Sequence, residues 1–98
     1  MMLRNERTGK EQAVMLGDIL YAHVDRDTKL DQRKTWSFRC QGYLLRPDQN
    51  YILGPGDMAF RLGYDCFTTT TEAREFGKRS MRDQYKLVKI SDEERIKV

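Results

Sequence analysis

Histidine and cysteine, which most often build catalytic pairs and metal sites, are scarce in this sequence. It has one histidine, His23, and two cysteines, Cys40 and Cys66. A zinc site needs four clustered ligands, commonly with cysteines a few residues apart, and these two cysteines are distant in the chain. A nucleophilic thiol needs a base beside it, and no pattern places His23 next to either one. The sequence therefore predicts a protein that is not an enzyme and has no metal, cofactor or small-molecule substrate.

Long apolar runs are also missing. The longest mostly apolar segment, residues 13–24, contains Asp18 and His23 and is too short to cross a bilayer. The first residues lack the apolar stretch of a secretory signal. These absences predict a cytoplasmic protein without a membrane partner, in which Cys40 and Cys66 stay reduced and act as small buried apolar side chains.

What is present suits one small domain. The chain has 98 residues, of which 39% are hydrophobic and 34% charged, so the core is thin and its stability is modest or completed by a partner. No repeat or linker divides it, and we expect residues 1–98 to form a single domain with flexible tails at 1–10 and 91–98. A short helix that begins at the Ser91 and Glu94 capping pattern is the alternative for the second tail. The formal net charge of +3 makes the chain mildly basic.

The clearest local pattern predicts a helix over residues 70–82. Thr69 and Glu72 have the spacing of a capping box, in which the threonine hydroxyl accepts a first-turn N–H. Small and apolar residues then recur at helical spacing on one narrow face, which suits a helix that lies on a sheet. Those residues are Ala73, Phe76, Gly77, Ser80 and Met81. A strand is expected over residues 84–90, which follow the helix.

Alternating residues predict the main strand over 35–45. Trp36, Phe38 and Cys40 point to one face and polar residues point to the other, until Gly42 changes the phase as a bulge does. Pro47 begins a turn before a short strand at 51–53. The fold class is therefore α+β, with a small, mainly antiparallel sheet and one principal helix packed on it.

Two segments leave more room for interpretation. Gly17-Asp18 separates two apolar runs, which favours a two-residue hairpin, while helical spacing within residues 11–24 favours a single helix as the alternative. Asp57 is expected to cap one helical turn over residues 58–62, closed by Gly63.

Aromatic residues are more numerous than a core of this size needs, with one Trp, five Tyr and four Phe. Aromatic side chains anchor protein interfaces, so some of them are expected to bind a partner protein. The expected interface residues are Trp36, Tyr43, Tyr51, Pro55 and Phe60. Pro55 is included because glycine flanks it on both sides, and an unhindered Gly54-Pro55 bond is similar to the peptides that host prolyl isomerases bind.

Basic residues suggest a second kind of partner. Arg74, Lys78 and Arg82 recur at four-residue spacing on the predicted helix, and Lys86 and Lys89 follow on the predicted strand. Such a stripe can hold phosphates without reading a sequence. Nucleic-acid binding through this stripe is therefore the alternative function.

A helix-turn-helix form of that alternative rests on two short stretches. Residues 59–64, with Ala59, Leu62, Gly63 and Tyr64, and residues 76–79, which read Phe-Gly-Lys-Arg, resemble the second helix-turn-helix of AraC-type activators. The resemblance implies a helix before Gly63 and a DNA-recognition helix that ends near Phe76. The distance between these two residues is longer than in that family.

The length and the charged, unreactive composition of the chain resemble those of small accessory proteins of tailed phages. In size and mild basicity the chain is similar to the anti-RecBCD modulators of lambdoid phages, although no specific motif is shared. The resemblance implies a non-catalytic protein that binds and inhibits or modulates a larger host protein, such as a DNA-processing nuclease or helicase.

Overall fold

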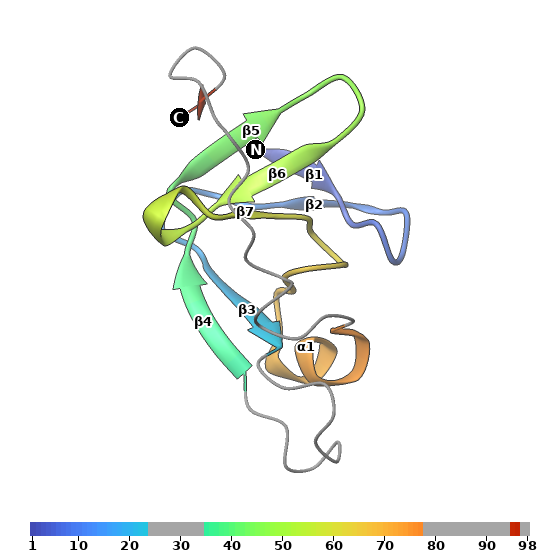
Figure 1. Ribbon diagram of the computed structural model, residues 1–98. Coiled ribbons are helices and arrows are strands. Elements are labelled where there is room, and N and C mark those ends of the chain that lie inside the picture. Colours follow the sequence, from blue (N-terminus) through green and yellow to red (C-terminus); the bar gives the residue numbers. More distant parts are fainter. Residues whose placement is uncertain (24–34, 78–94, 97–98) are drawn as a thin grey trace.

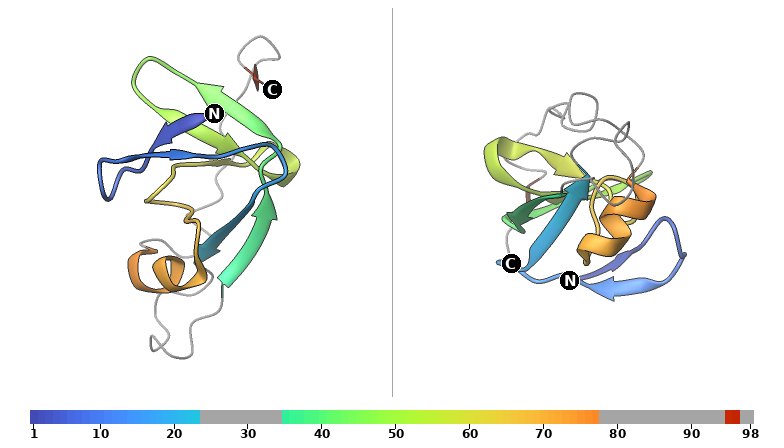
Figure 2. Two further views of the ribbon diagram at one scale, coloured as in Figure 1. Left: turned by 180° about the vertical axis from the view of Figure 1, so that it is seen from behind. Right: turned by 90° about the horizontal axis from the view of Figure 1, so that it is seen from below.

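The computed structural model describes residues 1–23, 35–77 and 95–96 (Figure 1). Its strands form three small antiparallel sheets, ordered β1-β2, β3-β4 and β7-β6-β5-β8, and the helix α1 packs on β3 and β4 (Figure 2). The elements are β1 (Met2–Arg4), β2 (Glu11–Ala13), β3 (Ile19–His23), β4 (Thr35–Arg39), β5 (Gly42–Leu45), β6 (Asn50–Leu53), a 3-10 turn η2 (Pro55–Asp57), β7 (Ala59–Phe60), α1 (Thr70–Phe76) and β8 (Arg95–Ile96). The α+β class is confirmed, with the strands divided among three sheets rather than one.

The alternation in β4 is confirmed by burial. Phe38 and Cys40 are buried, whereas Ser37 and Arg39 are exposed. Beyond β4 the chain changes sheets: Cys40 N–H donates to Asp18 O at 2.9 Å, and the next N–H donates to Leu53 O at 2.8 Å. The phase change expected from a bulge at Gly42 is therefore the passage from the β3-β4 sheet to the β5-β6 pair.

Gly17 lies in a turn between two strands, so the alternative of a helix over 11–24 is wrong. The predicted hairpin is also wrong, because β2 pairs with β1 and β3 pairs with β4. Asp18 N–H donates to Met15 O at 3.1 Å, and the Asp18 carboxylate accepts Met15 N–H at 2.9 Å. Gly17 has φ of +85°, a conformation that favours glycine. The turn therefore passes the chain between two sheets.

The first ten residues, expected to be loose, contain β1, with Leu3 and Asn5 only 3% exposed. The Asn5 side chain organises the loop to β2. Its Oδ1 accepts the N–H groups of Arg7 at 2.9 Å and Thr8 at 3.1 Å, and its Nδ2 donates to Gln12 at 2.8 Å. Of residues 91–98 the structure describes β8, whose backbone pairs with β5.

The core is built around stacked aromatic rings. The Phe38 ring lies 4.1 Å from the Phe60 ring and 5.4 Å from the Trp36 ring, measured between centroids. Gly54 is buried against Phe38 and Phe60: a Cβ there would lie 2.9 Å from each ring. Gly54 therefore fits closely against the two rings, and a carbon atom added at this position would force one of them to move.

The capping residues of α1 are confirmed, because Glu72 N–H donates to Thr69 Oγ1 at 3.2 Å. In a capping box the backbone N–H of the threonine donates to the glutamate carboxylate. Here the Thr69 hydroxyl donates to the Glu72 carboxylate instead. The helix ends at Phe76, earlier than predicted, because Gly77 takes an extended backbone. The remainder of the predicted helix and the predicted strand 84–90 lie outside the described residues.

Residues 55–66 differ from the prediction. Asp57 has φ of +62° at the end of η2 instead of capping a helix, and residues 59 and 60 form β7. The expected helical turn over 58–62 is therefore wrong. The helix that the AraC-type resemblance requires before Gly63 is absent from this described segment, where a strand and a turn take its place.

Candidate partner-binding surfaces

Two of the predicted interface residues are buried, and Trp36, Tyr51 and Pro55 are partly exposed. Phe60 and Tyr43 are 0% and 1% exposed, and the Tyr43 hydroxyl donates to Val14 O. Trp36 is half-buried on the ring stack, and Tyr51 packs on a small cluster formed by Leu44, Leu53 and Ala59. Side chains this deeply buried cannot anchor a partner while the fold is intact, so Tyr43 and Phe60 are core residues.

Pro55 does not lie in an unhindered loop. Gly54 N–H donates to Met58 O at 2.8 Å, and Met58 N–H donates to Pro55 O at 3.4 Å, so the turn is closed on both sides. Gly54 itself is buried against Phe38 and Phe60. The backbone is therefore packed on the Gly54 side of Pro55 and open on the Gly56 side, and docking of a prolyl isomerase stays a prediction.

Only one member of the basic stripe is among the described residues. Arg74 lies on α1 and is exposed. Lys78, Arg82, Lys86 and Lys89 lie outside the described residues. Phosphate binding by the stripe stays a prediction.

Four exposed apolar side chains lie instead on β1, in the turn after β2 and at the start of β3. Met2, Met15, Leu16 and Ile19 are 41–57% exposed, and we call these four residues the hairpin surface. The backbone brings its two ends together: Val14 N–H donates to Met1 O at 2.8 Å, and the Met1 amino group lies 3.4 Å from Met15 Sδ. Exposed methionines adapt their shape to a partner, so this surface suits protein binding.

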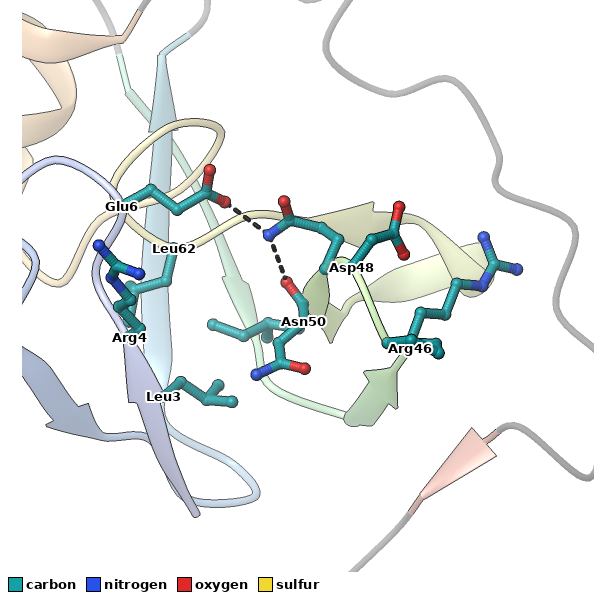
Figure 3. A pocket seen from close by; sticks show the side chains of 10 residues that line it. Leu3, Arg4, Glu6, Arg46, Asp48, Asn50 and Leu62 are labelled. Carbon is teal, nitrogen blue, oxygen red and sulfur yellow. Dashed lines mark hydrogen bonds between the residues drawn. The ribbon is translucent and has the colours of Figure 1, made fainter.

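A polar cleft of about 390 Å³ lies between β1 and the turn of the β5-β6 hairpin. Leu3, Ile52 and Leu62 form its apolar base. Figure 3 shows Arg4 and Glu6 on one side of the cleft and Arg46 and Asp48 on the other. Its rim is completed by Pro47, Gln49 and Asn50.

Glu6 is already engaged at the end of this cleft. Its carboxylate accepts two hydrogen bonds from the Arg61 guanidinium, one of them from Nε at 2.8 Å, and one from Gln49 Nε2 at 2.7 Å. The hydrogen bonds to Glu6 raise the pKa of Arg61 above its ordinary value. Arg61 also lies over the Tyr64 ring at 4.4 Å. The Glu6–Arg61 pair therefore fixes one wall of the cleft.

The neighbouring residue, Arg7, ties the same loop to α1. Its guanidinium lies 2.7 Å from the Glu72 carboxylate and 4.0 Å from the centre of the Phe76 ring. Partly exposed ion pairs contribute little each, but a planar guanidinium that also stacks on a ring is held in one orientation. The hairpin is thus joined to the rest of the fold by two adjacent arginine contacts.

The described residues offer little reactive chemistry. Cys40 and Cys66 are free and buried, as expected, and burial raises the pKa of the Cys66 thiol well above its ordinary value, which makes it unreactive. His23 ends β3, opposite Thr35. Within residues 1–23, 35–77 and 95–96, no three His, Cys, Asp or Glu side chains come together as metal ligands do, and no helix is long and apolar enough to span a membrane.

Comparison of the chain with family models, with curated proteins and with solved structures gave no match. Its function is therefore proposed from the arrangement of its own residues.

Neither surface was predicted from the sequence. The hairpin surface is built from Met, Leu and Ile, which sequence analysis assigns to a core by default. The cleft joins β1 to a turn more than forty residues further along, a contact that no local pattern reports. The one signal in the sequence is the apolar run broken by Gly17-Asp18, which marked a turn in which Leu16 becomes exposed.

Proposed function

We propose that this chain is a non-catalytic binding protein that modulates a larger protein through the hairpin surface. The observation that carries the proposal is the exposure of four large apolar side chains on β1, in the turn after β2 and at the start of β3. Exposed apolar groups are a liability in a small protein unless a partner covers them. Because Tyr43 and Phe60 are buried in the core, the four exposed aliphatic side chains are the more accessible anchors.

The class of partner is chosen from the length and the charge of the chain. A small, mildly basic chain that resembles phage accessory proteins suits capture of a host DNA-processing nuclease or helicase, with RecBCD as the specific candidate. Such a partner is reached in the cytoplasm, where the thiols of Cys40 and Cys66 stay reduced.

The test is direct binding to purified RecBCD, followed by its nuclease activity in the presence of the chain. The wild type is expected to bind and to change that activity. A double variant, Met2→Gln with Leu16→Gln, keeps the net charge and removes two anchors, so it should lose most of the binding. Thr71→Gln, on the exposed side of α1, serves as the matched control and should bind normally. If the double variant binds and modulates as well as the control, the hairpin surface is not the interface.

Nucleic-acid binding through Arg74 and the lysines and arginine that follow it is the alternative proposal. It predicts an affinity that falls steeply with added salt and is lowered about equally on every sequence by Arg74→Gln. A salt titration with duplex and single-stranded DNA measures both effects. Affinity for DNA that is insensitive to Arg74→Gln would exclude this stripe.

A further inference from the structure

One long edge of β4 has no strand beside it in the described part of the chain, where β4 pairs with β3 alone. The hydrogen bonds of β3 show which backbone groups lie on this edge. Tyr21 N–H donates to Phe67 O and Phe67 N–H donates to Tyr21 O, both at 2.8 Å. Because Tyr21 uses both groups toward Phe67, the residue opposite it in β4, Ser37, does not bond to it. The N–H and C=O of Ser37 therefore point away from β3.

Every second residue of β4 shares this orientation. Backbone groups alternate between the two sides of a strand, and Cys40 N–H donates toward β3, to Asp18 O at 2.9 Å. Thr35, Ser37 and Arg39 thus direct their N–H and C=O groups outward, and we call these three residues the β4 edge. Within residues 1–23, 35–77 and 95–96, no backbone group outside β3 bonds to them. Ser37 and Arg39 are also exposed.

The β4 edge lacks the features that usually prevent strands from pairing with other chains. Proteins protect sheet edges with very short strands, proline, lysine or a bulge. In the described part of the other large sheet, the outermost strands β7 and β8 have only two residues each. β4 has five residues without proline or lysine. Its one charged side chain, Arg39, donates to Gly17 O at 2.9 Å, next to the start of β3. The edge is therefore open to another strand.

We propose that the β4 edge pairs antiparallel with the β4 edge of a second copy of this chain, with a two-fold axis at Ser37. This axis places Ser37 opposite its own counterpart and Thr35 opposite Arg39 at both ends. All three outward residues then meet outward residues, and each pair exchanges two hydrogen bonds. An axis at any other residue of β4 pairs at most two residues of the edge with each other. The association goes beyond the proposed function and needs no other kind of protein.

The charges of the edge agree with a second copy in this register. The two Arg39 residues lie four positions apart along the pair, which is about 14 Å at about 3.4 Å per residue. That separation exceeds the screening length of about 8 Å at physiological ionic strength. An axis at Arg39 would instead place the two cations directly opposite each other, which is unfavourable. Three residue pairs make a small contact, so we expect a weak and reversible dimer.

Hydrogen exchange measured over a dilution series tests the edge directly. In the monomer, the amides of Ser37 and Arg39 should exchange as open backbone does, while the amide of Phe38, on the β3 side, is protected. Where sedimentation velocity shows about nine tenths of the chain as dimer, the Ser37 and Arg39 amides should exchange about tenfold more slowly. A chain that stays monomeric throughout the series overturns the proposal. Protection of the Ser37 and Arg39 amides in the monomer also overturns it, because another segment then covers the edge.

Two variants test the register. Ser37→Lys and Ser37→Glu each place like charges across the two-fold axis and should weaken self-association about fivefold, which corresponds to about 1 kcal/mol. An equal mixture of the two variants brings opposite charges together and should associate at least as tightly as the wild type. Circular dichroism establishes that each variant keeps its fold.

The control is the double variant Met2→Gln with Leu16→Gln, which leaves the β4 edge unchanged and should dimerise normally. Equal self-association of the wild type and both Ser37 variants would contradict the pairing at Ser37, as would a mixture that does not recover. Loss of the dimer in the double variant alone would assign self-association to the hairpin surface instead.

Discussion

The aromatic core and the β1-β2 hairpin hold their residues by different means. In the core, Phe38, Phe60 and Gly54 are in van der Waals contact, and almost nothing there is polar. The hairpin region buries Leu3 and Val14 in the same core and adds polar contacts, with Asn5 inside the loop and two arginine contacts that reach Glu6 and Glu72. The first arrangement is sensitive to volume, and the second is sensitive to hydrogen-bond geometry.

The outer side of the hairpin differs from the core in its exposure to solvent. Because buried Leu3 and Val14, together with these polar contacts, fix the inner side of the hairpin, its outer side does not need to contribute to the core. Met2, Met15 and Leu16 are therefore exposed without loss of the fold. In this chain the buried aromatic residues stabilise the fold, whereas Met2, Met15 and Leu16 are exposed on its surface.

The largest effect is expected in the core. Phe38→Ala should lower the free energy of unfolding by roughly 3–5 kcal/mol, because it removes a ring that stacks on both Trp36 and Phe60. Ser37→Lys, on the exposed face of the same strand, is the control and should change it by less than about 0.5 kcal/mol. Urea unfolding measures both. Equal losses in the two variants would remove the distinction between the faces of β4.

Gly63→Ala tests the contact between Gly63 and Asn5 of the hairpin loop. Gly63 has φ of +85°, and a Cβ there would lie 2.1 Å from Asn5 Oδ1. We expect a loss of about 3 kcal/mol, from the left-handed backbone and from the displaced Asn5. Gly56→Ala has a similar φ of +65° but open space around it, so it should cost only about 1–2 kcal/mol. Thermal unfolding of the pair isolates the contribution of Asn5, and equal losses would show that the contact contributes nothing.

Tyr43→Phe tests the link between the two regions, since the hydroxyl donates to Val14 O at the end of the hairpin. The loss should be about 1 kcal/mol, because Val14 O keeps a bond from the Met1 amino group at 3.0 Å.

The same residue predicts a dependence on pH. Burial, followed by the nearby Cys40 and Asp18, raises the pKa of Tyr43 from 10.0 to about 12. The neutral phenol is favoured in the fold, so this stabilisation is complete below pH 10.0 and is lost as pH rises toward about 12. Free energies of unfolding, measured at intervals across this range, should fall less in Tyr43→Phe than in the wild type. Parallel curves would contradict the role of Tyr43.

The smallest effect on stability is expected at the hairpin surface. The Met2→Gln, Leu16→Gln double variant should change the free energy of unfolding by less than about 1 kcal/mol, since both side chains are already in water. Its loss of partner affinity should be tenfold or more, as for interface anchors. Denaturation and binding measured on one sample establish both. A strongly destabilised double variant would show that these residues belong to the core.

Local signals in the sequence were reliable where the structure they predict is also local. The alternation around Phe38 and the Thr69 cap depend on neighbours within a few residues, and both are confirmed. The strand β1 was missed because its stability comes from Asn5 and from partners far along the chain. The end of α1 at Gly77 depends on a backbone angle that the apolar periodicity does not report.

The sites were harder to predict than the fold class. Tyr43 and Phe60 were expected at an interface because aromatic content exceeded the expected core, but the three-ring stack and the Tyr43 hydrogen bond use that surplus internally. The cleft depends on the relative position of β1 and the Pro47 turn, which only the folded chain fixes.

The arginine contacts of the hairpin also set an order of events at the ribosome. Arg7 and its partner Glu72 are 65 residues apart, which at about 5–20 residues per second corresponds to roughly 3–13 s of synthesis. During that interval the nascent hairpin lacks the contact that secures it, and its apolar side chains are open to chaperones. β1, which is made before Glu72, is therefore among the last parts of this fold to be fixed in place.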